Sequence, residues 1–376
     1  MIDFLEIRDS TRKLVGVIDN TKSIIWAAEY YGAGNFEIYA PFTDNTKALL
    51  QVGNYVTRRD DPNAGIIESI EYTNSLQDGQ MIIAAGRFAK SVLDRRIIYN
   101  LTGNANAPTR LTGNVATAAQ TVVQNHAGSG ASAARNMGIV LGSTGGITKT
   151  ITTAEGNPTS RQTSYGNLLE FTDGLLQEYQ CGAYIGINSN LQLEYICFEG
   201  KDRSKGNTAG NTPLTFSQDF DNLVSTEYTL NTATEKNAAL VGGEGEGMER
   251  FCVEISDSSL TPWERRETFI DASSQSRQYT DGGGNEQTYT VAEYAAMLTA
   301  QGRAELSQLN AEETFTGELN FIYSPYQYGI DKDFWLGDII TIQDNALGLY
   351  MGVRIIKATE VQDDNGYSIT VEYSTD

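Results

Sequence analysis

Short runs rich in β-branched and aromatic residues occupy the first hundred positions of the chain. The segments 35–41, 53–59 and 65–76 have this composition and are bounded by turn residues, which predicts strands. An Asp-Gly pair at 78–79 separates the third segment from the next apolar run, and Asp-Gly is a favoured sequence for a tight hairpin turn. The pattern predicts a β-rich block that contains a hairpin over residues 66–88.

Three later segments have apolar residues at the spacing of amphipathic helices. Residues 115–127 form the first, with Asn114 as the predicted N-cap, and residues 164–180 form the second. The third spans about 291–309, and Thr290 opens a Thr-x-x-Glu sequence of the kind that caps a helix N-terminus. We therefore expect helices that each bury one face.

Residues 181–198 are expected to form two strands around a turn at 188–190. If these three residues are the turn, Cys181 faces Cys197 across the pair of strands. Such a pair could form a disulfide, or it could be two small buried thiols. We favour buried thiols, because disulfides are rare in a reducing cytoplasm.

The C-terminal part of the chain returns to a strand pattern. Residues 214–242 show it first, and residues 367–374 alternate apolar and polar positions strictly. The Asn-Gly pair at 365–366 is a strong hairpin signal. The order of elements is β, αβ, β, α, β, which predicts a β-rich α+β protein.

Charge narrows the possible functions. The chain has 376 residues, of which 40% are hydrophobic, so it can bury sizeable cores. Its 27 Lys and Arg stand against 48 Asp and Glu, a formal net charge of −21. Binding to nucleic acid depends largely on Lys and Arg, so stable nucleic-acid binding is disfavoured. We see no signal peptide and expect no transmembrane segment.

Catalytic motifs are not found. His126 is the only histidine, and it lies at a predicted helix end, where a cation is favourable for electrostatic reasons alone. The three cysteines have no C-x-x-C spacing, so no metal site is predicted. The glycine-rich segments 142–150 and 242–247 do not match a phosphate-binding loop. We predict no catalytic residues and no cofactor, and we favour a structural or binding protein over an enzyme.

Several segments together carry a family resemblance. Residues 222–251, 264–273 and 332–373, with the N-terminal strand block, are similar to siphovirus tail hub or tail-associated (Tal-like) proteins. That family is related to the baseplate hub of contractile phages. The resemblance spans nearly the whole chain, in the same order, although no single motif is diagnostic.

The resemblance implies an architecture of two similar β-barrels and two smaller domains. On this chain the first barrel would span 1–106 and an α+β insert domain 107–213. The second barrel would be discontinuous, with parts at 214–245 and 315–376. A helical and loop insert domain would occupy 246–314.

The resemblance also implies a function. Family hubs are trimers that close the tail tube, adapt a sixfold tube to a threefold tip and form part of the DNA-ejection channel. The implied partners are the distal tail protein, the tail tube, the tape-measure protein and downstream tip or fibre proteins. The chain would be made in the host cytoplasm and act in the virion tail tip. DNA would pass only transiently, through a lumen that we expect to be acidic.

Two sets of residues match the family as structural positions. The barrel motif is matched by Trp335, Gly337, Asp338 and Arg354. The stretch R-x-x-x-F-x-D-x-S is matched by Arg265, Phe269, Asp271 and Ser273. Gly337 is expected at a turn and Trp335 in or beside a core, whereas no role is predicted for the second set.

Two alternative functions stay open. The 20 Tyr and 3 Trp could supply stacking platforms for a receptor- or carbohydrate-binding tip protein, although aromatic residues are equally common in cores. A carboxylate-based cell-wall hydrolase is less favoured. Some family members continue into a peptidoglycan-degrading domain, and we do not expect that activity here.

Overall fold

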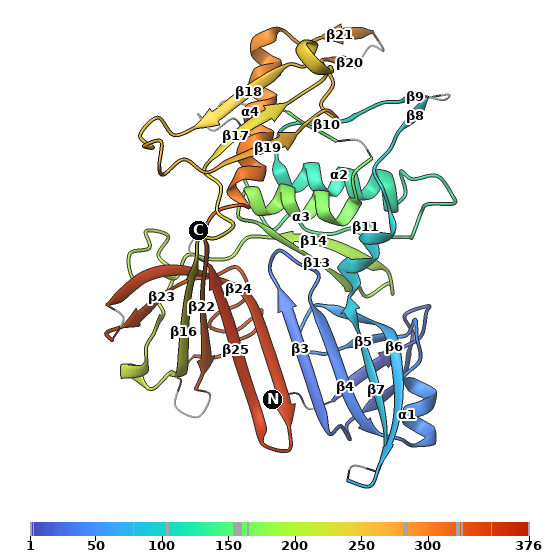
Figure 1. Ribbon diagram of the computed structural model, residues 1–376. Coiled ribbons are helices and arrows are strands. Elements are labelled where there is room, and N and C mark those ends of the chain that lie inside the picture. The colour runs from blue at the N-terminus through green and yellow to red at the C-terminus, as the bar shows by residue number, and fades with distance from the viewer. Residues whose placement is uncertain are drawn as a thin grey trace.

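The computed structural model describes residues 2, 4–77, 79–102, 105–152, 160–163, 165–280, 285–320, 324, 326–346 and 348–374. Two groups of strands lie at one end of the molecule, and two smaller inserts lie together at the other end (Figure 1). Among the described helices, none is long and apolar enough to cross a membrane.

One strand group comes from the N-terminal part of the chain and the other from its C-terminal half. The N-terminal strand group consists of β1 (Leu5–Arg8), β2 (Leu14–Ile18), β3 (Ser23–Glu29), β4 (Asn35–Pro41), β5 (Tyr55–Thr57), β6 (Ala64–Ser75) and β7 (Gly79–Phe88). It also carries the helix α1 (Asp44–Leu49) and the 3₁₀ helix η1 (Ala89–Arg95). The C-terminal strand group consists of β15 (Thr215–Phe216), β16 (Leu223–Asn231), β22 (Glu312–Leu319), β23 (Ile339–Asp344), β24 (Leu349–Asp363) and β25 (Gly366–Ser374), with the 3₁₀ helix η2 (Gln218–Phe220).

These two groups form one main sheet. Its order is β16-β22-β25-β24-β3-β4-β7-β6-β5-β1-β2, with β23 on β24 and β15 on β23. The described strands of this sheet form one open path of pairings with no closed barrel, so the expectation of two separate barrels is not confirmed. The groups are not independent, because β3 pairs with β24 and a single core contains Trp26 and Phe36 together with Phe216 and Val371.

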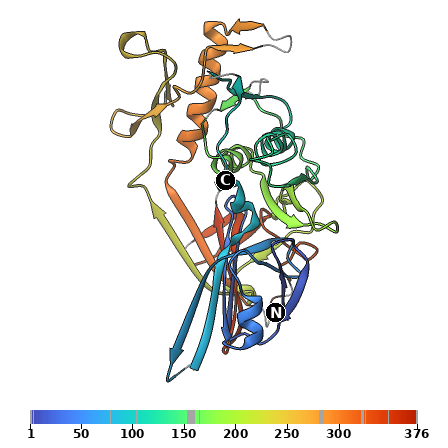
Figure 2. The same ribbon diagram turned by 90° about the vertical axis from the view of Figure 1, so that its right-hand side faces the viewer.

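Both predicted hairpins of the main sheet are confirmed. β6 and β7 pair antiparallel around a turn after Ser75, although Asp78 of the predicted turn lies outside the described residues. β24 and β25 pair around a turn at Asp364 and Asn365, one residue earlier than the predicted Asn-Gly pair, because Gly366 already pairs with Asp363. Figure 2 shows the β6–β7 hairpin as a long arm that extends beyond the rest of the N-terminal strand group.

The first insert has a core around two helices, and this core also includes Tyr55, Ile66 and Val92 of the N-terminal strand group. Its strands are β8 (Leu101–Thr102), β9 (Ala105–Asn106), β10 (Thr109–Leu111), β11 (Val140–Leu141), β12 (Arg161–Thr163), β13 (Gly182–Ile187) and β14 (Leu193–Phe198). Its helices are α2 (Val115–Ala127), which has the predicted bounds and cap, and α3 (Leu168–Glu178). The second helix is shorter than predicted, because Asn167 caps it by accepting hydrogen bonds from the backbone of Leu169 and Glu170.

The turn predicted at 188–190 is wrong by two residues. Asn188 caps a longer loop by accepting hydrogen bonds from the backbone of Asn190 and Gln192, so that Ile187 faces Leu193. Cys197 therefore faces Ala183 rather than Cys181. Both thiols are free and buried, as we favoured.

The second insert packs one helix on a small sheet. Its elements are β17 (Ala238–Gly242), η3 (Gly247–Glu249), β18 (Cys252–Ser256), β19 (Glu267–Asp271), β20 (Gln278–Thr280), β21 (Glu286–Thr288) and α4 (Val291–Ser307). The predicted capping box at Thr290 and Glu293 is present at the start of α4. β17, which a boundary at 245 would assign to the second barrel, instead pairs with β18 and β19.

Candidate functional site: the joint between the strand groups

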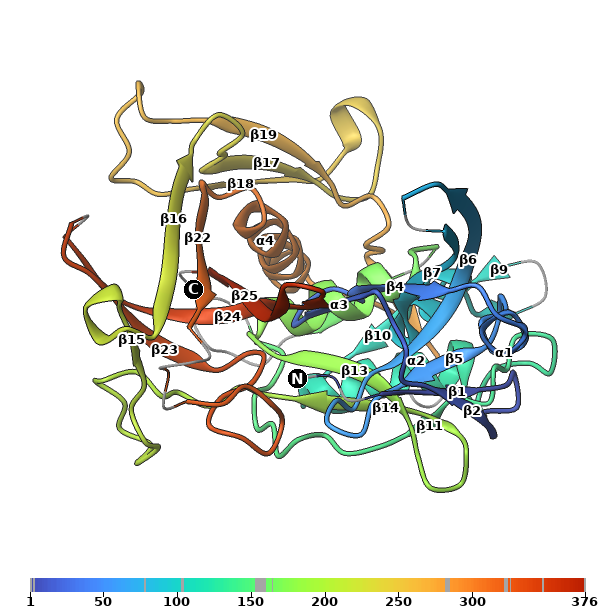
Figure 3. The same cartoon turned by 90° about the horizontal axis from the view of Figure 1, so that it is seen from below.

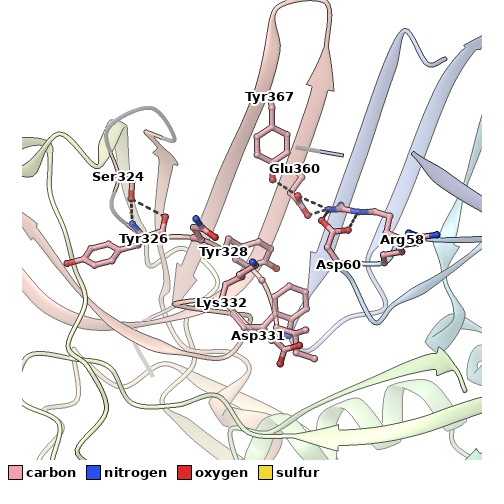
Figure 4. A pocket seen from close by; sticks show the side chains of 14 residues that line it. Arg58, Asp60, Ser324, Tyr326, Tyr328, Asp331, Lys332, Glu360 and Tyr367 are labelled. Carbon is pink, nitrogen blue, oxygen red and sulfur yellow. Dashed lines mark hydrogen bonds and ion pairs between the residues drawn. The ribbon is translucent and has the colours of Figure 1, made fainter. Parts of the chain in front are cut away.

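A buried ion pair lies at the joint, which we define as the pairing of β3 with β24. Glu360 of β24 stands opposite Trp26 of β3. The guanidinium of Arg58, which follows β5, donates to both carboxylate oxygens of Glu360 at 2.9 and 3.1 Å. The Arg58 side chain is 2% exposed and that of Glu360 6%. Arg58 also donates to Asp60 at 3.0 and 2.8 Å, and Figure 4 shows these contacts.

Neighbouring groups extend this pair into a network. The Arg58 guanidinium lies 5.3 Å from the ring centroid of Trp26, and the indole N–H of Trp26 donates to Asp61 at 2.9 Å. Burial raises the pKa of Asp61 above its ordinary value. Burial alone would lower the pKa of Arg58, but the carboxylates of Glu360, Asp60 and Asp61 together outweigh burial and keep that pKa above the ordinary value. The joint thus holds a guanidinium that stays charged.

A cavity of about 580 Å³ opens beside this network. The segment 326–332 lines one side and Arg58, Glu360 and Tyr367 line the other (Figure 4). The Tyr367 hydroxyl donates to Glu360. Arg58 is held in ion pairs with Glu360 and Asp60. Asp61 accepts hydrogen bonds from Trp26 and Asn63. The arrangement is therefore suited to fastening two strands together rather than to activating a nucleophile.

The barrel-motif residues meet at the start of β23. Asp338 accepts hydrogen bonds from the backbone of Trp335 at 3.2 Å and of Lys201 at 2.6 Å, and it pairs with the Arg203 guanidinium at 2.8 Å. Arg354 donates to the carbonyl of Gly337 at 2.7 Å. Trp335 is buried. These residues tie β23 to the segment that leaves the first insert.

Gly337 occupies a backbone position that favours glycine. Its φ is +83°, and a Cβ built there would lie 2.4 Å from the ring of Tyr30. The Tyr30 hydroxyl in turn donates to the carbonyl of Gln180 at 3.0 Å and accepts from the backbone of Gly200 at 3.2 Å. A side chain at this position would therefore disturb the contact between the main sheet and the first insert.

The two strand groups repeat the same local design. The N–H of Gly53 donates to Ile67 at 2.9 Å, and that of Gly337 donates to Ile355 at 2.8 Å. Ile67 and Ile355 each return a hydrogen bond at 2.9 Å, to the residue after the glycine. Both isoleucines also precede a bulge in the next hairpin. β5-β6-β7 and β23-β24-β25 are thus equivalent three-stranded units.

The second family stretch lies elsewhere. Arg265 pairs with Glu254 at 2.6 Å and with Glu267 at 2.5 Å, on the small sheet of the second insert. Asp271 accepts a hydrogen bond from the backbone of Ser273 at 2.9 Å and pairs with Arg250. The structure therefore does not bring Arg265 and Asp271 to the joint.

His126 is in the last turn of α2, but it is not the cation that the sequence suggested. The side chain is buried, and burial together with the charge of Arg135 lowers its pKa to about 4. The imidazole is therefore neutral at pH 7, and helix-end electrostatics do not explain its position.

One face of the main sheet is rich in carboxylates. Successive residues of a strand point to opposite faces, so the positions that alternate with the core define this second face. It carries Glu71 on β6, Glu37 on β4, Glu29 on β3, Glu372 on β25, Glu318 on β22 and Glu227 on β16. Lys357 and Arg87 also lie there, and each pairs with a glutamate. The negative charge of Glu37 raises the pKa of Tyr39. We name this surface the acidic face.

Sequence reasoning missed the ion pair, and it expected an acidic lumen without identifying the residues of the acidic face. The repeat that surrounds the joint is visible in the sequence, because V-G-N-Y-V-T at 52–57 parallels L-G-D-I-I-T at 336–341. That signal could have aligned β5 with β23 and the strands that follow. It could not have revealed Arg58 and Glu360 as partners, since they belong to different units of the repeat.

Comparison with solved structures identifies the fold. The chain is similar to a tail protein from Neisseria meningitidis MC58, with 13% identity over 99% of this chain and 96% of that one and a TM-score of 0.59. It is similar to the 43 kDa tail protein of prophage MuSo2 from Shewanella oneidensis, with 12% identity, 99% and 98% coverage and a TM-score of 0.55. It is also similar to prophage tail protein gp18 from Listeria monocytogenes EGD-e, with 12% identity over 98% of this chain and 94% of that one and a TM-score of 0.50.

The fold is thus that of phage tail proteins. Comparison with curated protein sequences gives no match. The chain belongs to the family described as Siphovirus ReqiPepy6 Gp37-like protein, whose model matches residues 4–373. The resemblance to siphovirus tail proteins is confirmed, and the named neighbours are tail proteins, in agreement with a structural rather than an enzymatic protein.

Proposed function

We propose that this chain is a trimeric hub of the phage tail tip, which closes the tail tube and adapts its sixfold symmetry to a threefold tip. The observation that carries the proposal is the internal repeat around the joint. One chain holds two equivalent units, fastened side by side by β3 and β24. Three such chains would present six similar units, which match a sixfold ring. The two inserts occur once per chain, so they would follow threefold symmetry.

The acidic face supports a role in DNA ejection. In the proposed ring this face lines the channel, and its glutamates repel the phosphates of passing DNA. Strong attraction would hold the genome in the tail, because phosphate contacts with Lys and Arg dominate affinity for DNA. Lys357 and Arg87 on this face are engaged in ion pairs with glutamates, which makes them less available to bind phosphate.

We assign a separate role in the tail to each proposed domain. Segment 1–106 and the strands of 214–245 and 315–376 form the two ring units, except that β8 and β9 are counted with the insert 107–213 and β17 with the insert 246–314. The barrel-motif residues join the second ring unit to the insert 107–213. The ring would contact the tail tube, the distal tail protein and the tape-measure protein, while the inserts are available for downstream tip or fibre proteins.

The oligomer and its symmetry test this function. Mass photometry of the purified full chain should show trimers, and electron microscopy of the same sample should show a ring of six similar lobes. A persistent monomer at tens of micromolar, or a ring with another number of lobes, would contradict the proposal. Charge is tested with linear duplex DNA: the native chain should give no shift in a gel, whereas Glu29→Lys, Glu37→Lys and Glu71→Lys together should retain DNA.

A further inference from the structure

Several strand edges of the main sheet have no partner strand in the described part of the chain, and two of them belong to β16 and β6. β16 lies at one end of the strand order and pairs only with β22. Residues 69–74 of β6 pair with β7 on one side, whereas β5 covers only residues 64–66 on the other side. Seen from below, β16 and β6 lie at opposite sides of the molecule (Figure 3). Such edges offer backbone donors and acceptors to a second chain.

The free edges of β6 and β16 correspond to the edges of β24 and β3 that pair in the joint. The bulges align Lys357 of β24 with Ser69 of β6. β22 pairs with β25 as β4 pairs with β7, so β22 corresponds to β4. β16 pairs with β22 as β3 pairs with β4, so β16 corresponds to β3. In this alignment Tyr228 of β16 corresponds to Trp26 of β3. β6 therefore carries an unused counterpart of the β24 edge, and β16 an unused counterpart of the β3 edge.

We propose that β16 of one chain pairs antiparallel with residues 69–74 of β6 in a second copy, in the register of the joint. This inference deepens the proposed hub and rests on it. In the joint, Lys357 faces Glu29 and Gln362 faces Ile24. The equivalent pairs between copies are Ser69 with Asn231, Ile70 with Leu230, Glu71 with Thr229, Tyr72 with Tyr228, Thr73 with Glu227 and Asn74 with Thr226.

On the core face, this register places apolar side chains of β6 opposite apolar side chains of β16. Ile70 and Tyr72 point to the core face, since they pair with the buried Ala84 and Ile82. Tyr72 is nevertheless 53% exposed in the single chain, and Leu230 is 55% exposed. The register places Leu230 on Ile70 and Tyr228 on Tyr72, which covers apolar surface and pairs two aromatic rings.

The acidic face selects the same register. Glu71 falls opposite Thr229 and Glu227 falls opposite Thr73, so no two carboxylates face each other. A slip of one residue would place core-facing side chains opposite those of the acidic face. A slip of two residues in one direction would set Glu71 directly opposite Glu227, and like charges in that position are destabilising.

Repetition of the joint also explains how the ring closes. A head-to-tail contact closes into a ring only if its rotation divides a full turn. If the contact between copies has the geometry of the contact within the chain, each step along the sheet turns by the same angle. The sheet then runs unbroken through every copy, with the acidic face on one continuous surface.

Disulfide trapping tests the register in the full-length chain. All variants carry Cys252→Ser, which removes the exposed natural thiol. The test variant adds Glu71→Cys and Thr229→Cys. The positive control adds Ala27→Cys and Thr359→Cys, the equivalent pair within the joint. The negative control adds Glu71→Cys and Ser225→Cys, a pair displaced by four residues. Each protein is oxidised with copper phenanthroline and run on a non-reducing gel, beside mass photometry of the unoxidised sample.

We expect the test variant to give covalent dimers and trimers and the displaced pair to give none, while the positive control closes within one chain. Trimers by mass photometry without linkage of the test pair would overturn the register and leave the hub proposal standing. Equal linkage of the test and displaced pairs would overturn it as well. Linkage that continues beyond trimers would support the strand pairing and contradict the trimeric hub. Monomers without linkage at the highest attainable concentration would overturn both.

Discussion

Replacing Arg58 by methionine should destabilise the protein more than any exposed charge substitution. The variant removes both hydrogen bonds to Glu360 and leaves that carboxylate 6% exposed, with its charge uncompensated. Breaking a buried ion pair in this way typically costs about 3–5 kcal/mol. Loss of the contact with the Trp26 ring adds to this cost, whereas Asp60, which is 57% exposed, is readily hydrated. We expect a fall of about 4 kcal/mol in the free energy of unfolding.

Urea unfolding followed by circular dichroism measures this loss. The matched control is Arg87→Met, which breaks a partly exposed pair with Glu68 and should cost about 1 kcal/mol or less. The double variant Arg58→Met with Glu360→Leu should recover most of the stability, because an apolar pair can replace a buried ion pair. If Arg58→Met costs no more than the control, or if the double variant is no more stable than the single one, the joint does not depend on this ion pair.

Three further predictions concern single positions, each checked by urea unfolding. Gly337→Ala should cost about 3 kcal/mol, because strain at positive φ adds to a clash with Tyr30; Gly53→Ala at the equivalent turn, where the structure leaves open space, should cost about 1 kcal/mol, and equal costs would contradict the steric argument. His126 binds a proton more weakly when folded, so stability should be lost as pH falls from its ordinary pKa of 6.5 toward about 4. That loss should reach about 2 kcal/mol at pH 5, and a His126→Gln variant that keeps the full pH dependence would refute it. Thr290→Ala should cost about 1 kcal/mol through loss of the capping box, and no change would show that the cap is dispensable.

Local features of the fold could be predicted because their causes are local. The hairpin predicted from Asn365 and Gly366 and the caps at Asn114 and Thr290 depend on residues within a few positions of one another. The structure confirms both caps and the hairpin, whose turn lies one residue earlier than predicted. The turn after Ile187 failed for an equally local reason. The side chain of Asn188 satisfies two backbone donors and thereby lengthens the loop, an effect that counting residues does not include.

The joint could not be predicted, because its causes are not local. Arg58 and Glu360 lie 302 positions apart and belong to different strand groups. Charged residues in strands are ordinarily assigned to the solvent face, so pattern reasoning places Glu360 outside the core. Its burial follows only from the approach of Arg58 over Trp26. The acidic face was expected as a property of a lumen, but its residues emerge only from the register of the strands.

The long sequence separation across the joint has a consequence for synthesis on the ribosome. Until β24 has been made, β3 presents an unpaired edge, and Arg58 has no buried partner for its charge. The N-terminal strand group must therefore wait as an incomplete intermediate for most of translation, and contacts this distant in sequence form slowly. A chain interrupted before β24 lacks one half of the joint and the unit β23-β24-β25, so it cannot contribute two units to the proposed ring. In the proposed ring, the order of strands along the chain therefore favours the assembly of completed polypeptides.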